Sequence, residues 1–233
     1  MKASVTAIGN EGFRVESGDR VVWIDAFYRP ILSVGSAPAW KAEDVDRADL
    51  ILVTHVHWDH FEMKAVVQAA TRTGAMVVGP ALVTDVLQER LRPEQVIELE
   101  PPERKAGKPG AATAEAGGAT VTALRTFHSR GHNSYRVELP GFTFFHDGDN
   151  EDTRRIDAKA LGRIDALFIG PWQGSGWVDF VEALSPRRWF LMHLNDEELD
   201  QHARGAFLPD LCDHIPLPDR LVVLRPDESC EMP

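Results

Sequence analysis

One stretch of the chain decides its fold: Asp49-Leu50-Ile51-Leu52-Val53-Thr54-His55-Val56-His57-Trp58-Asp59-His60. Its first half is a continuous apolar run, which predicts a fully buried strand. Three histidines and an aspartate follow within six residues, although the whole chain has only nine histidines. Alternation along the strand places His55 and His57 on one side, and a turn then lets Asp59 and His60 close on a second point nearby. Imidazole suits zinc and other late divalent ions, so this segment predicts a metal site.

Strand and helix signals alternate on both sides of this stretch. The N-terminal third predicts a β-meander, and a β-α-β-α-β order follows, which implies helices packed against a sheet. Residues 101–119 are rich in Pro, Gly, Ala and Lys and predict a mobile surface loop. We expect one domain over residues 1–233. The predicted strands span 4–8, 13–15, 20–25, 49–54, 76–78, 96–99, 120–127, 134–139, 142–145, 164–169, 188–192 and 221–224, and the predicted helices 63–70, 81–91 and 178–184.

The composition is ordinary for a globular protein, with 43% hydrophobic and 26% charged residues. A formal net charge of −11 disfavours non-specific binding to nucleic acid or to anionic membranes. The start of the chain does not read as a signal peptide, and no stretch approaches the length of a membrane span, so we expect a cytoplasmic protein. The two cysteines, Cys212 and Cys230, exclude a disulfide framework.

The motif His-x-His-x-Asp-His after an apolar strand resembles the signature of the metallo-β-lactamase superfamily. The segments 8–13 and 22–25 are similar to the first hairpin of that family, in which Asp25 would be a supporting acid. Phe145-His146-Asp147-Gly148-Asp149-Asn150 resembles the later Gly-Asp-Thr motif, with asparagine in place of threonine, and Leu191-Met192-His193 resembles the strand that delivers the last histidine. The fold that this resemblance implies is α+β, a four-layer αβ/βα arrangement with two mixed β-sheets between helices.

The resemblance also implies two metal sites. His55, His57 and His128 would form the first, and Asp59, His60 and His193 the second. Asp149 would bridge them. For the third histidine of the first site, His128 resembles the lactonase and RNA-processing members, whereas Gly131-His132 could match hydroxyacylglutathione hydrolases. The predicted strand end favours His128. The cofactors implied are two divalent ions, Zn²⁺ first, with Mn²⁺ or Fe²⁺ as alternatives.

The implied activity is hydrolysis by a hydroxide bridging two divalent metals. Asp59 would orient the hydroxide, and His132 or His146 would donate a proton to the leaving group. The compact length and the segment around His193 look most like the branch that contains ascorbate-6-phosphate lactonase, so we expect a small-molecule lactone, ester or phosphodiester substrate. A nuclease is the alternative, against which the acidic charge argues. A diiron redox protein is a further alternative, although diiron relatives usually have glutamate at the position of His57. The sequence does not decide the oligomeric state, and a homo-oligomer is possible.

Several remaining residues allow a plain and a functional interpretation. Trp58 and Trp172 could line a pocket, although tryptophans more often serve in core or surface packing. The Gly-rich segment 171–177 resembles a loop on the substrate side in this family. His202 and His214 lie in a charged, proline-bearing tail and are expected at the surface.

Overall fold

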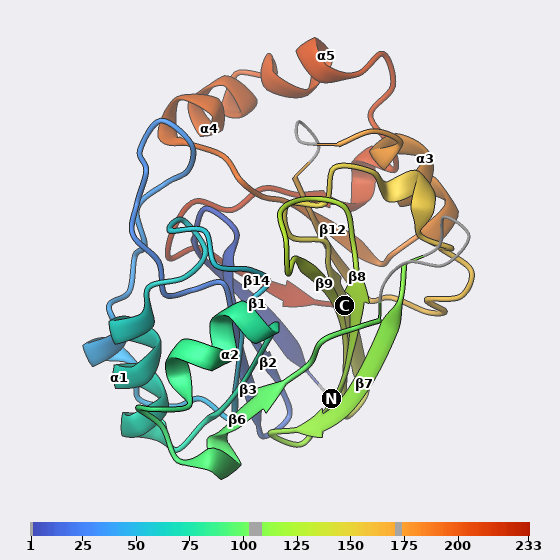
Figure 1. The fold of residues 1–233 in the computed structure, drawn as a ribbon. Helices are drawn as coiled ribbons and strands as arrows, with labels where there is room; N and C mark the ends of the chain where they lie inside the picture. The colour runs from blue at the N-terminus through green and yellow to red at the C-terminus, as the bar shows by residue number, and fades with distance from the viewer. Residues whose placement is uncertain (1, 103–108, 171–173) are drawn as a thin grey trace.

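Two seven-stranded sheets face each other in the computed structural model, which describes residues 2–102, 109–170 and 174–233 (Figure 1). Each sheet is mixed, with antiparallel pairs at one end and parallel pairs at the other. The two ends of the chain lie side by side, because Ala3 pairs with Met232. The predicted α+β four-layer fold is confirmed. That residues 1–233 form one domain stays a prediction.

The first sheet contains the N-terminal meander and the strand before the histidine motif. Its parallel part begins where β3 pairs with β4, so that two buried strands end at the same edge. In spatial order, the strands are β14 (Ser229–Met232), β1 (Ala3–Gly9), β2 (Gly12–Ser17), β3 (Arg20–Ile24), β4 (Leu50–Leu52), β5 (Met76–Gly79) and β6 (Val96–Glu98).

The second sheet repeats this plan with the C-terminal half of the chain. The parallel part runs from β10 through β11 and β12 to β13. In spatial order, the strands are β13 (Leu221–Val222), β12 (Arg188–Leu191), β11 (Ala166–Ile169), β10 (Phe142–His146), β9 (Asn133–Leu139), β8 (Ala119–Arg125) and β7 (Ala111–Ala116).

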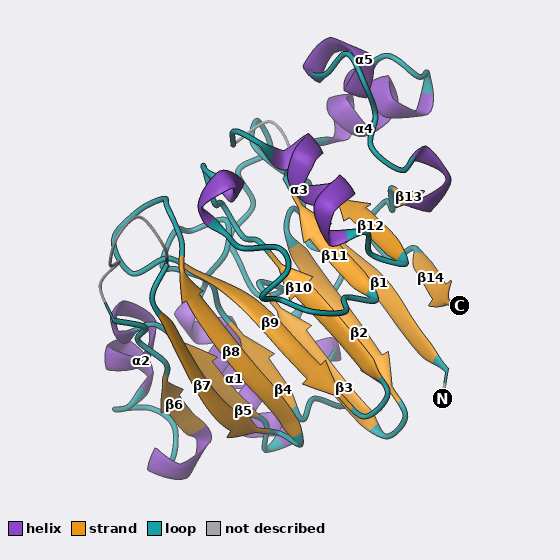
Figure 2. Cartoon of the chain, turned by 90° about the vertical axis from the view of Figure 1, so that its right-hand side faces the viewer, coloured by secondary structure: helices purple, strands orange, loops and turns teal. Residues whose placement is uncertain are grey.

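Helices cover the outer face of each sheet, so three apolar layers separate four structural layers (Figure 2). Phe168 and Phe190 stack between the sheets, with ring centroids 5.0 Å apart. Trp23 lies under the helices of the first sheet and Trp189 under those of the second. Burying one large apolar side chain of this kind contributes roughly 1.5–3 kcal/mol to the free energy of unfolding. The helices are α1 (Met63–Thr73), α2 (Ala81–Leu87), α3 (Trp177–Leu184), α4 (Asp196–Ala203) and α5 (Phe207–Leu211).

Helix α1 begins directly after the histidine motif, and local capping fixes its start. The Glu62 side chain accepts a hydrogen bond from the backbone N–H of Ala65, at 2.6 Å. At the other end Gly74 adopts φ 76°, a left-handed conformation that favours glycine and ends the helix. The motif is therefore held between a buried strand and a capped helix.

One sequence-based expectation about a loop was wrong, and in a second region the sequence analysis predicted no helix. Within the predicted loop 101–119, residues 111–116 form β7, which pairs with β8 across a turn at Gly117 and Gly118. Residues 103–108 of that loop lie outside the described residues. The expected tail beyond His193 contains α4, α5 and β14. Small side chains explain the first miss, because Ala112 and Ala114 pack against the core without the branched residues typical of strands.

Candidate metal centre

The predicted ligands all follow strands that end at one edge of the two sheets. The histidine motif follows β4, Asp25 follows β3, and Asp149 follows β10. His193 follows β12, and His128 follows β8, which runs parallel to β10 because both are antiparallel to β9. Carboxyl ends of strands that run in the same direction meet at the same edge, so segments far apart in sequence converge there.

The first group of side chains contains His55, His57, His128 and Asp149, whose ligand atoms all lie within 4.8 Å of one another. The Nε2 atom of His128 is 3.3 Å from Asp149 Oδ2 and 3.3 Å from His57 Nδ1. His55 Nε2 is 3.7 Å from the same Asp149 oxygen. Three imidazole nitrogens and one carboxylate oxygen therefore point at a common space.

The second group contains Asp59, His60 and His193, again within 4.8 Å of one another. The Nε2 atoms of His60 and His193 are each 3.7 Å from Asp59 Oδ2. Each is also 3.4 Å from Asp149 Oδ1. Asp149 thus presents one oxygen to the first group and the other oxygen to the second.

Asp25 orients two of these histidines from behind. Its carboxylate accepts hydrogen bonds from the backbone N–H of Thr54 at 2.8 Å and from the Thr54 hydroxyl at 2.5 Å. It also accepts one from His60 Nδ1, at 3.0 Å. The Thr54 hydroxyl in turn accepts from His55 Nδ1 at 2.9 Å. Both rings therefore engage Nδ1 and direct Nε2 towards the centre, as metal-binding histidines do. Burial disfavours the charged form of His60, but the charge of Asp149 outweighs it and holds the pKa of His60 well above its usual value, so a cation there would take the place of the proton on Nε2.

His128 is oriented in the same way from the other side. Its Nδ1 donates to Glu151 at 2.9 Å, which leaves Nε2 facing Asp149. Asn150 helps to hold this segment, because its Oδ1 accepts the backbone N–H of Phe127 at 3.1 Å. The asparagine that replaces the expected threonine therefore links the Asp149 turn to the end of β8.

Burial keeps the histidine at the base of the first group neutral. His55 is fully buried, and burial followed by the charge of His60 lowers its pKa well below the usual value. A neutral ring has a lone pair to offer. The Nε2 atoms of His55 and His60 are buried and have no hydrogen-bond partner among the described residues. Such atoms cost about 1–3 kcal/mol each when they are left unpaired, and a cation would satisfy them.

His132 and His146 are the two predicted proton donors, and their surroundings differ. His132 is fully buried, and its Nδ1 lies 2.9 Å from the Thr126 hydroxyl, while Nε2 has no hydrogen-bond partner among the described residues. A Cβ atom on Gly148 would lie 2.6 Å from that Nε2, so the position next to Asp149 requires glycine. His146 has both nitrogens engaged by backbone: Nε2 donates to the Glu11 carbonyl, and Nδ1 accepts the Gly148 N–H. Its geometry therefore favours a positioning role.

Glu11 is a site residue that the sequence analysis did not identify. It occupies the turn between β1 and β2 and is completely buried. One of its oxygens lies within 4.8 Å of ligand atoms of Asp149 and His193. Burial, and then the charge of Asp149, raise the pKa of Glu11 well above its usual value. A glutamate in a short Gly-Asn-Glu-Gly turn forms no pattern, so only the fold reveals it.

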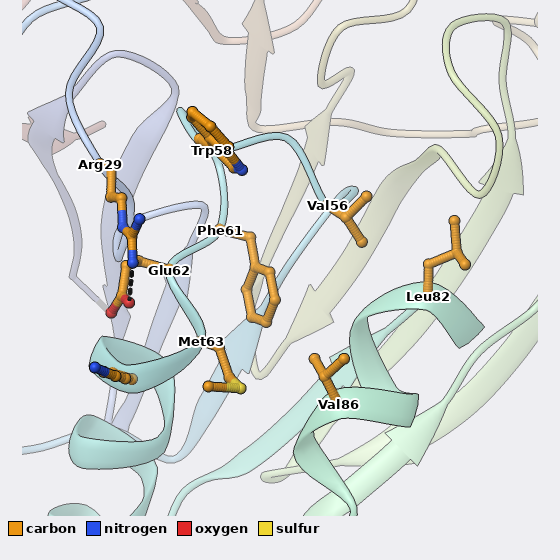
Figure 3. Close-up of a pocket in the computed structure, with 9 residues that line it drawn as sticks. Arg29, Val56, Trp58, Phe61, Glu62, Met63, Leu82 and Val86 are labelled. Carbon is orange, nitrogen blue, oxygen red and sulfur yellow. Dashed lines mark hydrogen bonds and ion pairs between the residues drawn. The ribbon is translucent and has the colours of Figure 1, made fainter.

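A hollow of about 310 Å³ lies against the other side of the histidine motif, as Figure 3 shows. Val56 and Trp58 alternate with the histidines and line it, and Trp58 is 68% exposed. Leu82 and Val86 of α2 form the facing wall, and an Arg29–Glu62 ion pair lies at one end. Trp58 therefore lines a hollow, and none of the predicted metal ligands is among the residues that line it.

The other residues singled out in the sequence lie away from the centre. Trp172, with the rest of 171–173, lies outside the described residues. Trp177 is buried and packs against Trp189. His214 is exposed at the surface, as expected, beside Glu182, and His202 lies partly exposed on α4. No helix in the described part of the chain is long and apolar enough to cross a membrane.

The His128→Ala variant should lose about one metal ion per chain after reconstitution, whereas His132→Ala should retain most of both. The reason is that His128 Nε2 lies in the first group of ligand atoms, while His132 is absent from that group. Elemental analysis of the dialysed proteins measures the difference, with the wild-type chain as the reference. The opposite ranking of the two variants would transfer the ligand role to His132.

Comparison with known proteins agrees with this geometry. A model of the beta-lactamase superfamily domain matches residues 20–203. A UPF0173 metal-dependent hydrolase of Nitratidesulfovibrio vulgaris is 34% identical, over 98% of this chain and 95% of that protein. Another, from Pyrococcus furiosus, is 29% identical over 98% of this chain and 99% of that protein.

Solved structures show the same fold at lower identity. A metallo hydrolase from Ignicoccus hospitalis superposes with a TM-score of 0.70 at 18% identity, covering 100% of this chain and 99% of its own. CmlA, a diiron β-hydroxylase from Streptomyces venezuelae, gives a TM-score of 0.63 at 15% identity, covering 99% of this chain and 54% of its own. From the matched domain and the full-length relatives, we conclude that the chain belongs to the metallo-β-lactamase superfamily and, within it, to the UPF0173 metal-dependent hydrolases.

Proposed function

We propose that this protein is a hydrolase that holds two divalent metal ions and cleaves a lactone, an ester or a phosphodiester. One observation carries the proposal: the two oxygens of Asp149 face different groups of ligand atoms, one 3.3 Å from His128 and the other 3.4 Å from His60 and His193. A carboxylate in this position suits a bridge between two cations, whose mutual repulsion it reduces.

The residues present fit such ions. His55, His57 and His128 would hold the first, and Asp59, His60 and His193 the second, because these donors are buried or half-buried and converge. Two ions bound there would lower the pKa of a coordinated water and polarise a carbonyl or phosphoryl oxygen. The imidazole-rich first group is suited to Zn²⁺, with Mn²⁺ or Fe²⁺ as alternatives.

The side chains around the ligands would then orient the reactants. Asp25 and Thr54 hold His55 and His60 in one tautomer. The Asp59 carboxylate, close to His60 and His193, would accept a hydrogen bond from the attacking water and align it. Burial lowers the pKa of His132 well below its usual value, so its Nε2, buried next to the Asp149 turn, would first take a proton from the attacking water and then pass it to the leaving group.

The substrate would be a small molecule. The net charge of −11 counts against a polynucleotide, so the nuclease alternative ranks second. A diiron redox function has less support, because His57 stands where such relatives have glutamate. The narrower likeness to the ascorbate-6-phosphate lactonase branch stays a prediction.

A panel of lactone, thioester and chromogenic phosphodiester substrates tests the activity. The chain is first reconstituted separately with zinc, manganese and iron. We expect turnover of a lactone or phosphodiester that a chelator abolishes and that the Asp59→Asn variant lacks. Fully loaded protein that turns over none of these substrates, or retention of iron alone with redox activity, would contradict the proposal.

A further inference from the structure

Glu11 is a buried carboxyl group to which no N–H or hydroxyl group of the described residues donates a hydrogen bond. Its side-chain partner is a second carboxyl group, that of Asp149: burial, and then the charge of Asp149, raise the pKa of Glu11 well above its usual value. The Oε2 atom of Glu11 lies 3.7 Å from His60 Nδ1, but that nitrogen already donates to Asp25 at 3.0 Å. A carboxylate buried without a donor is costly and calls for a cation.

The surroundings of Glu11 are those of the second group of ligands. An oxygen of Glu11 lies within 4.8 Å of ligand atoms of both Asp149 and His193. A Cβ atom on Gly170 would lie 3.4 Å from Glu11 Oε1 and 3.4 Å from His193 Cβ. The Glu11 carboxylate therefore lies between the end of β11 and the end of β12, next to His193.

The turn that carries Glu11 is attached to three segments of the metal centre. Its backbone carbonyl accepts a hydrogen bond from His146 at 2.9 Å. Asn10 donates from Nδ2 to the Asp59 carbonyl at 2.8 Å, and its own carbonyl accepts the His193 N–H at 3.0 Å. These contacts fix the position of Glu11 relative to Asp59 and His193 before any ion binds, which is what preorganises a ligand.

We propose that Glu11 is a further carboxylate ligand of the metal ion that Asp59, His60 and His193 hold. This inference rests on the proposed two-metal function. The second site then offers oxygens of Glu11, Asp59 and Asp149 beside two imidazoles, whereas the first offers three imidazoles and one oxygen. Carboxylate ligands suit manganese better than zinc, so the second site should be the one with the higher preference for Mn²⁺.

The Glu11→Gln variant tests this ligand role through metal binding. The amide keeps the shape of the side chain and removes its charge. We therefore expect the Mn²⁺ dissociation constant of the site formed by Asp59, His60 and His193 to rise at least about tenfold, while that of the other site changes little. In the cobalt-substituted protein, the visible absorption of the second ion should change because one oxygen ligand is lost. Glu16→Gln is the matched control: it lies on the same hairpin, pairs with Arg14 and should bind like wild type.

Thermal unfolding of the metal-free proteins separates ligation from packing. Glu11 faces the carboxylates of Asp25 and Asp149, so Glu11→Gln should leave the metal-free melting temperature equal or higher. A lower metal-free melting temperature together with unchanged Mn²⁺ affinity and cobalt spectrum would overturn the ligand role alone. Wild-type protein that binds fewer than two ions per chain after reconstitution would overturn the two-metal function as well.

Discussion

Asp149→Asn is expected to lose one of two bound metal ions and to lower turnover at least about a thousandfold. The carboxylate faces both groups of ligands, with Oδ1 3.4 Å from His60 and His193 and Oδ2 3.3 Å from His128. Asparagine keeps the shape but presents one neutral oxygen, so it cannot compensate two neighbouring charges. The strands of the core are unchanged, and the fold should persist.

Elemental analysis and steady-state kinetics on the best substrate of the panel measure this effect. Asp147→Asn, two residues earlier, is the matched control. Asp147 is buried and accepts hydrogen bonds from Ser134 and Asn150, but it belongs to neither ligand group. Burial raises its pKa to about 8, and asparagine keeps the shape of the side chain and an oxygen that accepts these hydrogen bonds. If Asp149→Asn retained both ions and near-normal turnover, the bridging role would have to be withdrawn.

The fold was predictable because its strongest signals are local. The apolar run of β4 predicts a strand buried on both faces, and the polar residues after it predict a site at the end of that strand. Hydrophobic periodicity likewise predicts α1 after the motif. The resemblance then supplied the distant partners Asp149 and His193, which composition or spacing alone could not have joined.

What the sequence could not predict depends on pairing between distant segments. Glu11 belongs to the site only because β1 runs parallel to β3 and so ends at the same edge as β4. Strand β7 has an alanine-rich sequence with low strand propensity, and its pairing with β8 decides its conformation. Helix α4 is a different case, because Asn195 and Glu198 form a capping box, a pattern that can be seen in the sequence itself.

Removing the metals should abolish turnover and lower the melting temperature by roughly 8–16 °C for each ion lost. Four carboxyl groups gather at the centre, from Glu11, Asp25, Asp59 and Asp149, and all four residues are buried. Bound cations compensate this charge only in the folded chain, so they stabilise it by mass action. At free metal a thousand times the dissociation constant, one site contributes about 4 kcal/mol, and each kcal/mol shifts the melting temperature of a chain of 233 residues by about 2–4 °C.

Differential scanning fluorimetry with a chelator, followed by a return of zinc or manganese, measures this shift. The Asp149→Asn variant should show a smaller shift of the melting temperature on chelation, because it holds fewer ions at the start. Recovery of both the melting temperature and turnover on adding metal separates ion loss from irreversible unfolding. A melting temperature that the chelator leaves unchanged, in protein shown by elemental analysis to have lost its ions, would mean that the buried carboxylates are stabilised without cations. The ligand assignment would then lose its energetic basis, because those side chains would have no need of the ions proposed to hold them together.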